Sequence, residues 1–325
     1  MKKITLIMLL AFAAVFTVSC SSGQKSKAEG KPQSSAESSK PDEGEAAALK
    51  TEKWKSGKDN SEHTATIYSL GNTAEEIKKE LSGEIKLSHK FIDNVPVYEM
   101  YREDRQNAPV VLFMHGQLSR KEENLGDMTA FADAGYFCVA LDLQGHGERV
   151  TDEPLMALEI TKNTSSDIDL LLDYYSLCKA AESKKFALIG FSQGGSTAYW
   201  YSAYGESTPS ALIVGSTSPD FNYPRDNTCI SGGELTKQTW SDSKIKEFVN
   251  KYNPINHWEK LLKTPVLSGN SLDDEIVSYK GSEALEKKLS KGGNKDISFF
   301  YFDGAGHNIT KEFLDKMLPF VQKYL

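Results

Sequence analysis

The stretch from Phe186 to Gly194 reads FALIGFSQG and combines two signals. It begins with an apolar run, as a strand must when both faces of its sheet are covered. The remainder matches Gly-x-Ser-x-Gly, a pattern in which a strand turns sharply into a helix and leaves the serine hydroxyl exposed. Side chains at Gly190 and Gly194 would collide within such a turn, which is why both positions need glycine. A helix N-cap role for Ser192 would leave both glycines unexplained, so we interpret Ser192 as a nucleophile that follows a buried strand.

Further apolar runs of strand length lie at residues 110–114, 137–141, 211–214, 265–267 and 297–302. The segments between them carry apolar residues near helical spacing. Strands that alternate with helices predict a mainly parallel sheet with helices on both faces. Residues 87–91 and 97–101 flank Asp93-Asn94 and predict an antiparallel hairpin at the start of this sheet. We therefore expect one α/β domain over residues 51–325.

One connection is much longer than the others, because nearly fifty residues lie between 216 and 263 without a predicted core strand. An insertion of this length is usually functional, and we expect a small lid over a cleft, after the sixth strand. The insertion contains many aromatic residues, namely Phe221, Tyr223, Trp240, Phe248, Tyr252 and Trp258. These side chains either form an apolar pocket or pack the lid on its own helices, and the sequence leaves both readings open.

A serine hydroxyl is a weak nucleophile until a base takes its proton, and a carboxylate usually orients that base. His307 follows the last predicted strand, in a glycine-containing loop that can bend back toward Ser192. His257 is a rival, but it lies in the insertion and follows no strand. We expect His115, the residue after a strand, to brace its loop, whereas His63 and His89 precede the sheet core and have no evident partner.

Three acidic residues, Asp273, Asp274 and Glu275, follow the strand at 265–267. Asp274 is the favoured orienting acid because Asp-x-x-Val fits Asp274 to Val277. Asp273 stays an alternative, and Asp220 is a weaker one. Adjacent acids of this kind can also simply stabilise the start of the following helix.

The oxyanion of an acyl-transfer intermediate needs preorganised N–H donors. One predicted donor is the backbone N–H of Gln193, directly after the nucleophile. The other is the backbone N–H of Gln117 in the loop His115-Gly116-Gln117, where glycine lets the main chain approach the site.

These motifs together resemble the α/β-hydrolase superfamily over about residues 95–325. They occur in the order that the superfamily has. The motifs are His115-Gly116, Asp142 to Gly147, Gly190 to Gly194, the acids at 273–275 and Gly306-His307. Within that superfamily the chain is similar to the dienelactone-hydrolase and prolyl-oligopeptidase-like serine carboxylesterases of bacteria. The resemblance implies a mostly parallel eight-stranded sheet flanked by helices. It also implies hydrolysis of small or medium carboxylic esters through an acyl-enzyme, with Ser192, Asp274 and His307 as the triad and a structural role for His146.

The N-terminal segment has the pattern of an export signal. Lys2 and Lys3 precede an apolar run too short to span a membrane comfortably, which predicts a signal peptide over residues 1–19. Residues 17–20 read TVSC and resemble a bacterial lipobox, so we expect Cys20 to carry the lipid. No large apolar residue occurs from 21 to 48, which predicts a disordered tether over 20–50. The expected location is the cell envelope, with the lipid in the outer membrane or the outer face of the cytoplasmic membrane.

Composition and missing motifs argue against nucleic-acid binding, metal or cofactor chemistry and a disulfide-rich fold. Lys and Arg number 38 against 45 Asp and Glu, a net charge of −7 that argues against nucleic acid as a partner. There is no His-Glu-x-x-His, Cys-x-x-Cys or phosphate-loop motif, so we expect neither a metal nor a cofactor. Four cysteines do not make a disulfide framework, although a Cys178–Cys229 bridge stays open.

Two other functions fit the same motifs. A peptidase or thioesterase would use the same triad, although we expect no propeller-sized domain in the N-terminal segment. A binding lipoprotein would keep the fold without turnover. The joint presence of nucleophile, base, acid and oxyanion loops favours the esterase.

Overall fold

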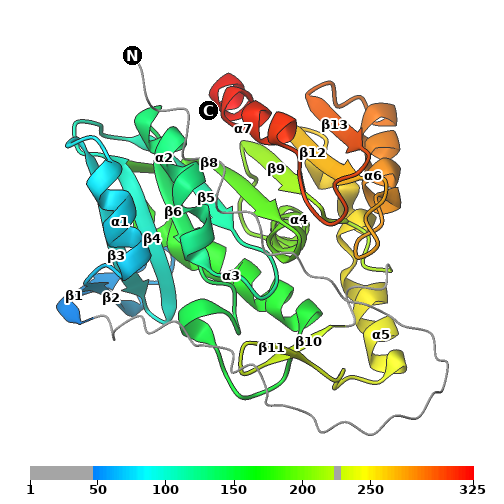
Figure 1. Ribbon diagram of the computed structural model, residues 1–325, viewed down its shortest axis with the longest axis horizontal. Coiled ribbons are helices and arrows are strands. Elements are labelled where there is room, and N and C mark those ends of the chain that lie inside the picture. The colour runs from blue at the N-terminus through cyan, green and yellow to red at the C-terminus, as the bar shows by residue number, and fades with distance from the viewer. Residues whose placement is uncertain (1–46, 223–227) are drawn as a thin grey trace, which may run out of the picture. The chain divides into compact units, whose positions relative to one another are not determined.

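The computed structural model describes residues 47–222 and 228–325 of the chain (Figure 1). The predicted signal peptide, the lipobox with Cys20 and most of the predicted tether lie outside the described residues. The first strand begins at Ala48, within the last residues of the segment predicted as tether.

Ten strands form the main sheet in the order β1-β2-β3-β4-β6-β5-β8-β9-β12-β13. Their bounds are β1 Ala48–Lys55, β2 Glu62–Tyr68, β3 Ile85–Ile92, β4 Val95–Arg102, β5 Ala108–Met114, β6 Phe137–Leu141, β8 Ala181–Phe191, β9 Ala211–Gly215, β12 Val266–Ser271 and β13 Ile297–Phe302. Pairing is antiparallel from β1 to β6 and parallel from β6 to β13. The mainly parallel sheet and its leading β3–β4 hairpin are therefore confirmed.

The expected number of eight strands is wrong, because β1 and β2 extend the antiparallel edge of the sheet. Nearly every residue of β1 is exposed, so this strand carries no apolar run that the sequence could have revealed. β1 pairs with β2, and β2 in turn pairs with β3. Backbone pairing, rather than burial of an apolar face, defines this edge.

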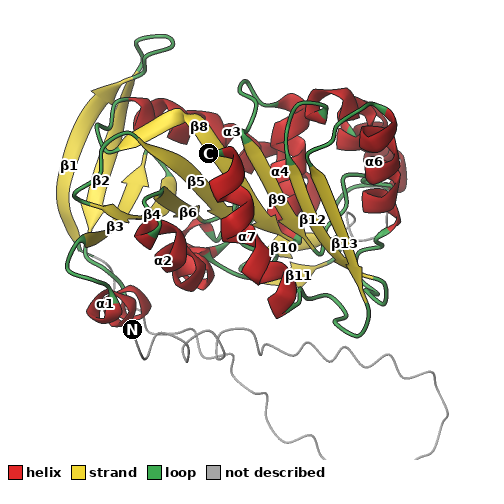
Figure 2. Ribbon diagram, turned by 90° about the horizontal axis from the view of Figure 1, so that it is seen from above, coloured by secondary structure: helices red, strands yellow, loops and turns green. Residues whose placement is uncertain are grey.

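Helices cover both faces of the sheet, as Figure 2 shows. Their bounds are α1 Asn72–Glu80, α2 Leu125–Asp133, α3 Ala157–Ser176, α4 Gln193–Tyr204, α5 Asp242–Tyr252, α6 Lys280–Lys291 and α7 Lys311–Tyr324. Alternate residues of β5 point to opposite faces. Val110 and Leu112 join the core formed with α3, α4 and α6, whereas Val111 and Phe113 join the core formed with α1, α2 and α7.

The long insertion at residues 216–263 follows β9, where the sequence places it. It supplies β10 Cys229–Ser231, β11 Glu234–Thr236, α5 and the 3-10 helix η4 Pro254–Leu261. β10 pairs with β11 and also with the short strand β7 Leu155–Met156, which gives a second, three-stranded sheet. The insertion is thus joined by backbone pairing to the segment directly before α3.

Aromatic side chains attach this insertion to α4. The Trp200 ring on α4 stacks on Phe221 and Phe248, with ring centroids 5.9 Å and 5.6 Å apart. Trp240 and Tyr252 both pack against Phe248. Of the two readings left open by the sequence, packing of the insertion is the one that these described residues follow.

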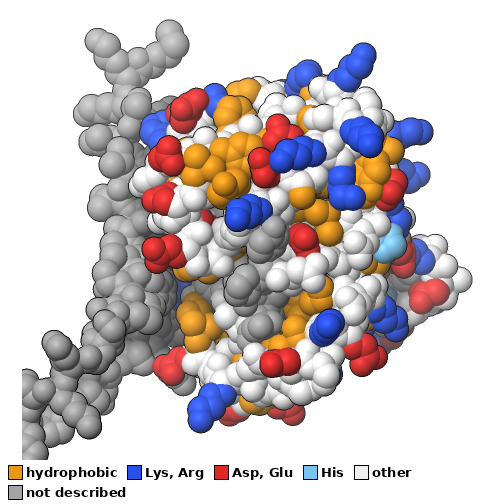
Figure 3. All heavy atoms as spheres, turned by 90° about the vertical axis from the view of Figure 1, so that its right-hand side faces the viewer, with side chains coloured by type: hydrophobic (Ala, Val, Ile, Leu, Met, Phe, Trp, Pro, Cys, Tyr) orange, Lys and Arg blue, Asp and Glu red, His pale blue; other side chains and the backbone are white. Residues whose placement is uncertain are grey.

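Cys138, Cys178 and Cys229 are free, so the Cys178–Cys229 bridge left open by the sequence is not formed. Among the described residues, every helix is too short or too polar to cross a bilayer. On the face that carries α6 and β13, acidic and basic side chains lie interspersed between small apolar areas (Figure 3).

Candidate active site

Ser192 lies at the sharp turn between β8 and α4. Its backbone has φ 54° and ψ −116°, a region that residues other than glycine rarely adopt. A Cβ at Gly190 would lie 2.4 Å from the Gly194 carbonyl oxygen, and a Cβ at Gly194 would lie 2.2 Å from the Met114 carbonyl oxygen. Both glycines are therefore required by close backbone approach. Ser192 occupies the N-cap position of α4, but its side chain makes no capping hydrogen bond to the helix.

A hydrogen-bonded line joins Ser192 to residues far along the chain. The Ser192 Oγ is 2.8 Å from His307 Nε2, and His307 Nδ1 is 2.8 Å from Asp274 Oδ2. The Asp274 side chain is only 1% exposed, and its other oxygen accepts the backbone N–H groups of Ile276 and Val277 at 2.8 Å each. These contacts hold the carboxylate against the imidazole.

Asp273, the alternative acid, faces the backbone of the loop that carries His307. Its Oδ1 accepts the N–H groups of Gly304 and Gly306 at 3.1 Å and 3.3 Å, together with the Ser271 hydroxyl. The Ser271 hydroxyl bond holds the pKa of Asp273 below its usual range. The two adjacent acids therefore contact different parts of one loop, Asp274 the imidazole and Asp273 the main chain.

The rival residues named from the sequence lie elsewhere. His257 packs its ring against Tyr204, with ring centroids 4.8 Å apart. Asp220 accepts hydrogen bonds from Asn222 and Asn253 within the insertion. Neither contact leads to Ser192.

Gln193 follows Ser192 in the chain, and Gln117 follows Gly116, which approaches Ser192. A Cβ placed on Gly116 would lie 3.5 Å from the Ser192 Cβ, which puts the following residue, Gln117, at the site. Gln193 is the first residue of α4, where N–H groups have no partner within the helix. Within residues 47–222 and 228–325, the backbone N–H groups of Gln117 and Gln193 make no hydrogen bond. A donor to a substrate oxyanion must be unpaired in this way.

His115 braces the loop that leads to Gln117, as the sequence predicts. Its Nδ1 donates to the Gly116 carbonyl oxygen at 2.7 Å, and its Nε2 accepts the Leu143 N–H at 3.1 Å. Burial lowers the pKa of His115 to about 3, so its ring is neutral. His146 packs edge-on against it and donates from Nδ1 to the Gln144 carbonyl oxygen at 2.9 Å. These contacts match the structural role that the resemblance implies for His146.

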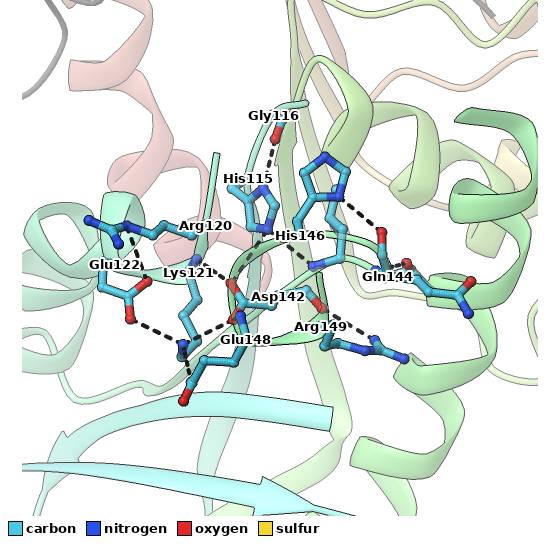
Figure 4. A network of polar contacts seen from close by, with 12 residues as sticks. His115, Gly116, Arg120, Lys121, Glu122, Asp142, Gln144, His146, Glu148 and Arg149 are labelled. Atoms are coloured by element: carbon cyan, nitrogen blue, oxygen red, sulfur yellow. Dashed lines mark hydrogen bonds and ion pairs between the residues drawn. The ribbon is translucent and has the colours of Figure 1, made fainter. Parts of the chain in front are cut away.

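Behind this loop lies a buried ionic network centred on Lys121 (Figure 4). The Lys121 Nζ is 3.0 Å from Asp142 Oδ2 and 2.5 Å from Glu148 Oε2, and its side chain is only 1% exposed. Glu148 also contacts His89 at 2.8 Å. Sequence reasoning missed Lys121, because a lysine in a polar segment carries no signal that separates a buried position from a surface one.

A second line of the same residue types joins Ser61 and His63, at the start of β2, to Asp93 in the turn between β3 and β4. Ser61 Oγ is 2.6 Å from His63 Nε2, and His63 Nδ1 is 2.6 Å from Asp93 Oδ2. Ser61 also donates its hydroxyl to Asp59 Oδ1 at 2.6 Å. His63 and His89 thus both have partners that the sequence did not reveal. Among the described residues, no group of three or more His, Cys, Asp or Glu side chains is placed to hold a metal ion.

Comparisons with known proteins place this geometry among hydrolases. The profile of the prolyl oligopeptidase family matches residues 125–325. The esterase YjfP of Escherichia coli (strain K12) is 23% identical over 248 residues, which cover 74% of this chain and 100% of that protein.

Two solved structures share the fold. The acylaminoacyl peptidase of Pyrococcus horikoshii has a TM-score of 0.58 at 18% identity, over 86% of this chain and 50% of that one. A cold-adapted esterase from an Arctic intertidal metagenomic library has a TM-score of 0.53 at 19% identity, over 75% of this chain and 99% of that one. The α/β-hydrolase fold expected from the sequence is confirmed.

Proposed function

This chain belongs to the prolyl oligopeptidase family of serine hydrolases, and within it we propose an esterase that cleaves small or medium carboxylic esters through an acyl-enzyme. The observation that carries the proposal is the line of two 2.8 Å contacts from Ser192 through His307 to Asp274. We assign the oxyanion donors to the backbone N–H groups of Gln117 and Gln193, which make no hydrogen bond to another described residue. Nucleophile, base, orienting acid and oxyanion donors are the parts that acyl transfer needs.

The proton path follows from which ring nitrogen faces which partner. Asp274 is acceptor-only when ionised, so His307 donates from Nδ1 and keeps a lone pair on Nε2. That lone pair takes the Ser192 proton while Oγ attacks the ester carbonyl. His307 then returns the proton to the leaving alcohol, and a water molecule repeats the sequence to release the acid. Asp274 stabilises the imidazolium that forms at each stage.

The negative charge that develops on the substrate oxygen is received by the two backbone N–H groups. Each such donor typically lowers the barrier by about 3 to 4 kcal/mol. A backbone donor already held in place does not have to reorganise when the charge forms.

The share of each relative's length that this chain matches supports ester rather than peptide cleavage. The esterase YjfP is matched over 100% of its length, whereas the acylaminoacyl peptidase is matched over 50% of its chain. Hydrolysis rates for p-nitrophenyl esters of rising acyl length, measured beside aminoacyl p-nitroanilides and thioesters, test this choice. Esters should turn over fastest. Faster turnover of anilides or thioesters would make the protein a peptidase or thioesterase.

A fluorophosphonate probe tests the nucleophile directly. The wild type should be labelled and Ser192→Ala should not, while Ser61→Ala, with its serine in the hairpin, serves as the matched control and should label normally. A folded wild type that resists the probe would end the proposal and favour a binding protein without turnover.

We also propose that the chain is a bacterial lipoprotein, attached to a cell-envelope membrane through Cys20. The proposal rests on the sequence of residues 1–20 alone. Each buried CH₂ of an attached acyl chain contributes about 0.8 kcal/mol to membrane binding. Cells treated with an inhibitor of prolipoprotein signal peptidase should accumulate a larger precursor, and Cys20→Ser should release the protein from the membrane. An unchanged size and an unchanged membrane fraction would contradict this proposal.

A further inference from the structure

The side chains of Gln117 and Gln193 are connected by hydrogen bonds that pass through Thr228. Gln117 Nε2 donates to Thr228 Oγ1 at 2.8 Å. The Ala157 N–H donates to the Thr228 carbonyl oxygen at 2.9 Å, and Gln193 Nε2 donates to the Ala157 carbonyl oxygen at 2.9 Å. We call this chain of Gln117, Thr228, Ala157 and Gln193 the glutamine bridge. It links the two residues whose backbone N–H groups face the proposed oxyanion.

Two members of the glutamine bridge are fixed by regular structure. Ala157 is the first residue of α3 and Gln193 the first of α4, and both are almost fully buried. Gln193 Nε2 also donates to Thr161 Oγ1 at 2.5 Å, one turn further along α3. Loss of such an acceptor would leave a buried amide donor without a partner and destabilise the folded state. These bonds therefore hold the Gln193 side chain in place.

Gln117 has weaker local support. It lies in a loop outside any helix or strand, between Gly116 and Leu118, and Leu118 has φ 60°. Its side chain reaches out of this loop to the insertion, where Thr228 directly precedes β10. Backbone pairing of β10 with β7 then ties Thr228 to the start of α3. The long insertion therefore contacts the loop that presents one of the two proposed oxyanion donors.

We propose that Thr228 is a positioning residue, which holds the Gln117 N–H at the correct distance and angle from the Gln193 N–H. The inference rests on the proposed function, because it takes both N–H groups as oxyanion donors. Donors of this kind must lie within about 0.5 Å of the productive geometry to be effective. The insertion thus packs on α4 and, through the Thr228 hydroxyl, also fixes the position of one proposed oxyanion donor. The substrate in its ground state does not carry the oxyanion, so its binding should not depend on Thr228.

Thr228→Val tests the inference, since it removes the hydroxyl and keeps the size of the side chain. We expect kcat to fall about 5- to 20-fold with KM unchanged, the loss expected for one hydrogen bond. Thr228→Ser keeps the hydroxyl and should restore kcat. Ser231→Ala is the matched control, because Ser231 ends β10, the strand that Thr228 directly precedes, and donates to the Asp152 carbonyl oxygen at 2.7 Å, outside the glutamine bridge. Its kcat should stay at the wild-type value.

A double-mutant cycle with Gln117→Leu separates positioning from general loosening of the insertion. Gln117→Leu removes the same hydrogen bond from the other side and leaves the backbone N–H in place, which also serves if Thr228→Val does not fold. If both variants act through one bond, the double variant should be no worse than the poorer single variant. Affinity for a boronic acid that forms a tetrahedral adduct with Ser192 should fall by the same factor as kcat/KM.

Three results would overturn the inference: wild-type kcat in Thr228→Val, equal losses in Thr228→Val and Ser231→Ala, or losses that multiply in the double variant. Failure of the proposed function looks different, since the wild type itself would then neither hydrolyse esters nor take the fluorophosphonate.

Discussion

Two Ser–His–Asp lines occur in this molecule, and their distances are nearly the same. In the line at the end of β8, Ser192, His307 and Asp274 are joined by two contacts of 2.8 Å. In the second line, which runs from Ser61 through His63 to Asp93, the corresponding contacts are both 2.6 Å. Distances alone therefore do not separate an active site from a structural cluster.

The carboxylate partner of the serine hydroxyl distinguishes the second line. Ser61 donates its hydroxyl to Asp59 Oδ1 at 2.6 Å and also lies 2.6 Å from His63 Nε2. A hydroxyl that gives its single proton to a carboxylate does not give it to the imidazole beside it. In the first line, Ser192 Oγ lies 2.8 Å from His307 Nε2, and His307 Nδ1 faces the Asp274 carboxylate.

The backbone separates the two lines as well. Ser192 has a backbone φ of 54° at a turn that Gly116 approaches, and the proposed oxyanion donors follow Gly116 and Ser192 in the chain. Ser61 and His63 lie two positions apart on one hairpin, so their contact is local. If the proposed function is correct, the strained turn and the N–H donors, rather than the Ser–His–Asp contacts alone, distinguish the catalytic line.

The largest expected effect comes from removing each serine in turn. Ser192→Ala should lower ester turnover by about 10⁶-fold, because the nucleophile is lost. Ser61→Ala should change turnover less than about twofold, because its contacts are local and outside the site. Steady-state rates on a p-nitrophenyl ester measure both. A loss of turnover in Ser61→Ala, with activity kept in Ser192→Ala, would exchange the roles of the two lines.

The acids provide the next comparison. Asp274→Asn should lower kcat by about 10⁴-fold, because an amide can donate to His307 and favour the wrong tautomer. Asp93→Asn should leave kcat unchanged, since the Asp93 side chain contacts His63 and Thr64, which lie outside the proposed site. Comparable kcat values for the two variants would contradict the assignment of Asp274.

The next prediction concerns His115, the buried histidine that braces the loop beside Ser192, and the pH dependence of stability. Folded His115 has a pKa of about 3 because of burial, against an ordinary value of 6.5. Below the ordinary value, the unfolded chain binds a proton that the folded chain does not, so acid favours unfolding. The free energy of unfolding should therefore decrease by about 2 kcal/mol between about pH 6.5 and about pH 4.5 because of His115 alone.

Urea unfolding at a series of pH values measures this loss. His115→Gln cannot take up the proton and should show a shallower decline over the same range. Above pH 7 the wild type and the variant should respond to pH in parallel. Equal declines in the unfolding free energy of the wild type and His115→Gln between about pH 6.5 and about pH 4.5 would show that His115 does not contribute.

The smallest expected effect concerns the acid next to Asp274. Asp273→Asn keeps an oxygen that can accept the Gly304 and Gly306 N–H groups but removes the charge that strengthens those bonds. We expect kcat to fall no more than about 10-fold. If Asp273→Asn lost about 10⁴-fold while Asp274→Asn kept full turnover, Asp273 would be the orienting acid.

Much of the fold is readable along the chain, because buried strands need continuous apolar runs. β5, β6, β8, β9, β12 and β13 all fall on such runs. β1 and β2 were missed because β1 is exposed and is held by backbone pairing. The packing of Trp200 on the insertion could not be predicted either, since aromatic residues in a sequence do not show whether they form a pocket or a core.

For the site, local pattern was sufficient wherever backbone geometry demands a particular residue. Gly190 and Gly194 are such positions, because a Cβ at either one would collide with a carbonyl oxygen, and they locate Ser192 without any structure. The choice between Asp273 and Asp274 needed tertiary structure. They are neighbours in the chain, and only the fold of the loop decides which carboxylate meets the imidazole.

The same holds for Thr228 and Lys121, whose partners lie 111 and 21 positions away along the chain. A threonine or lysine is compatible with solvent or with burial, so its type carries no information about such a partner. The chain alone thus identified the residues that its own backbone requires, whereas tertiary packing selected the partners, because hydrogen bonds depend on distances that only the folded chain defines.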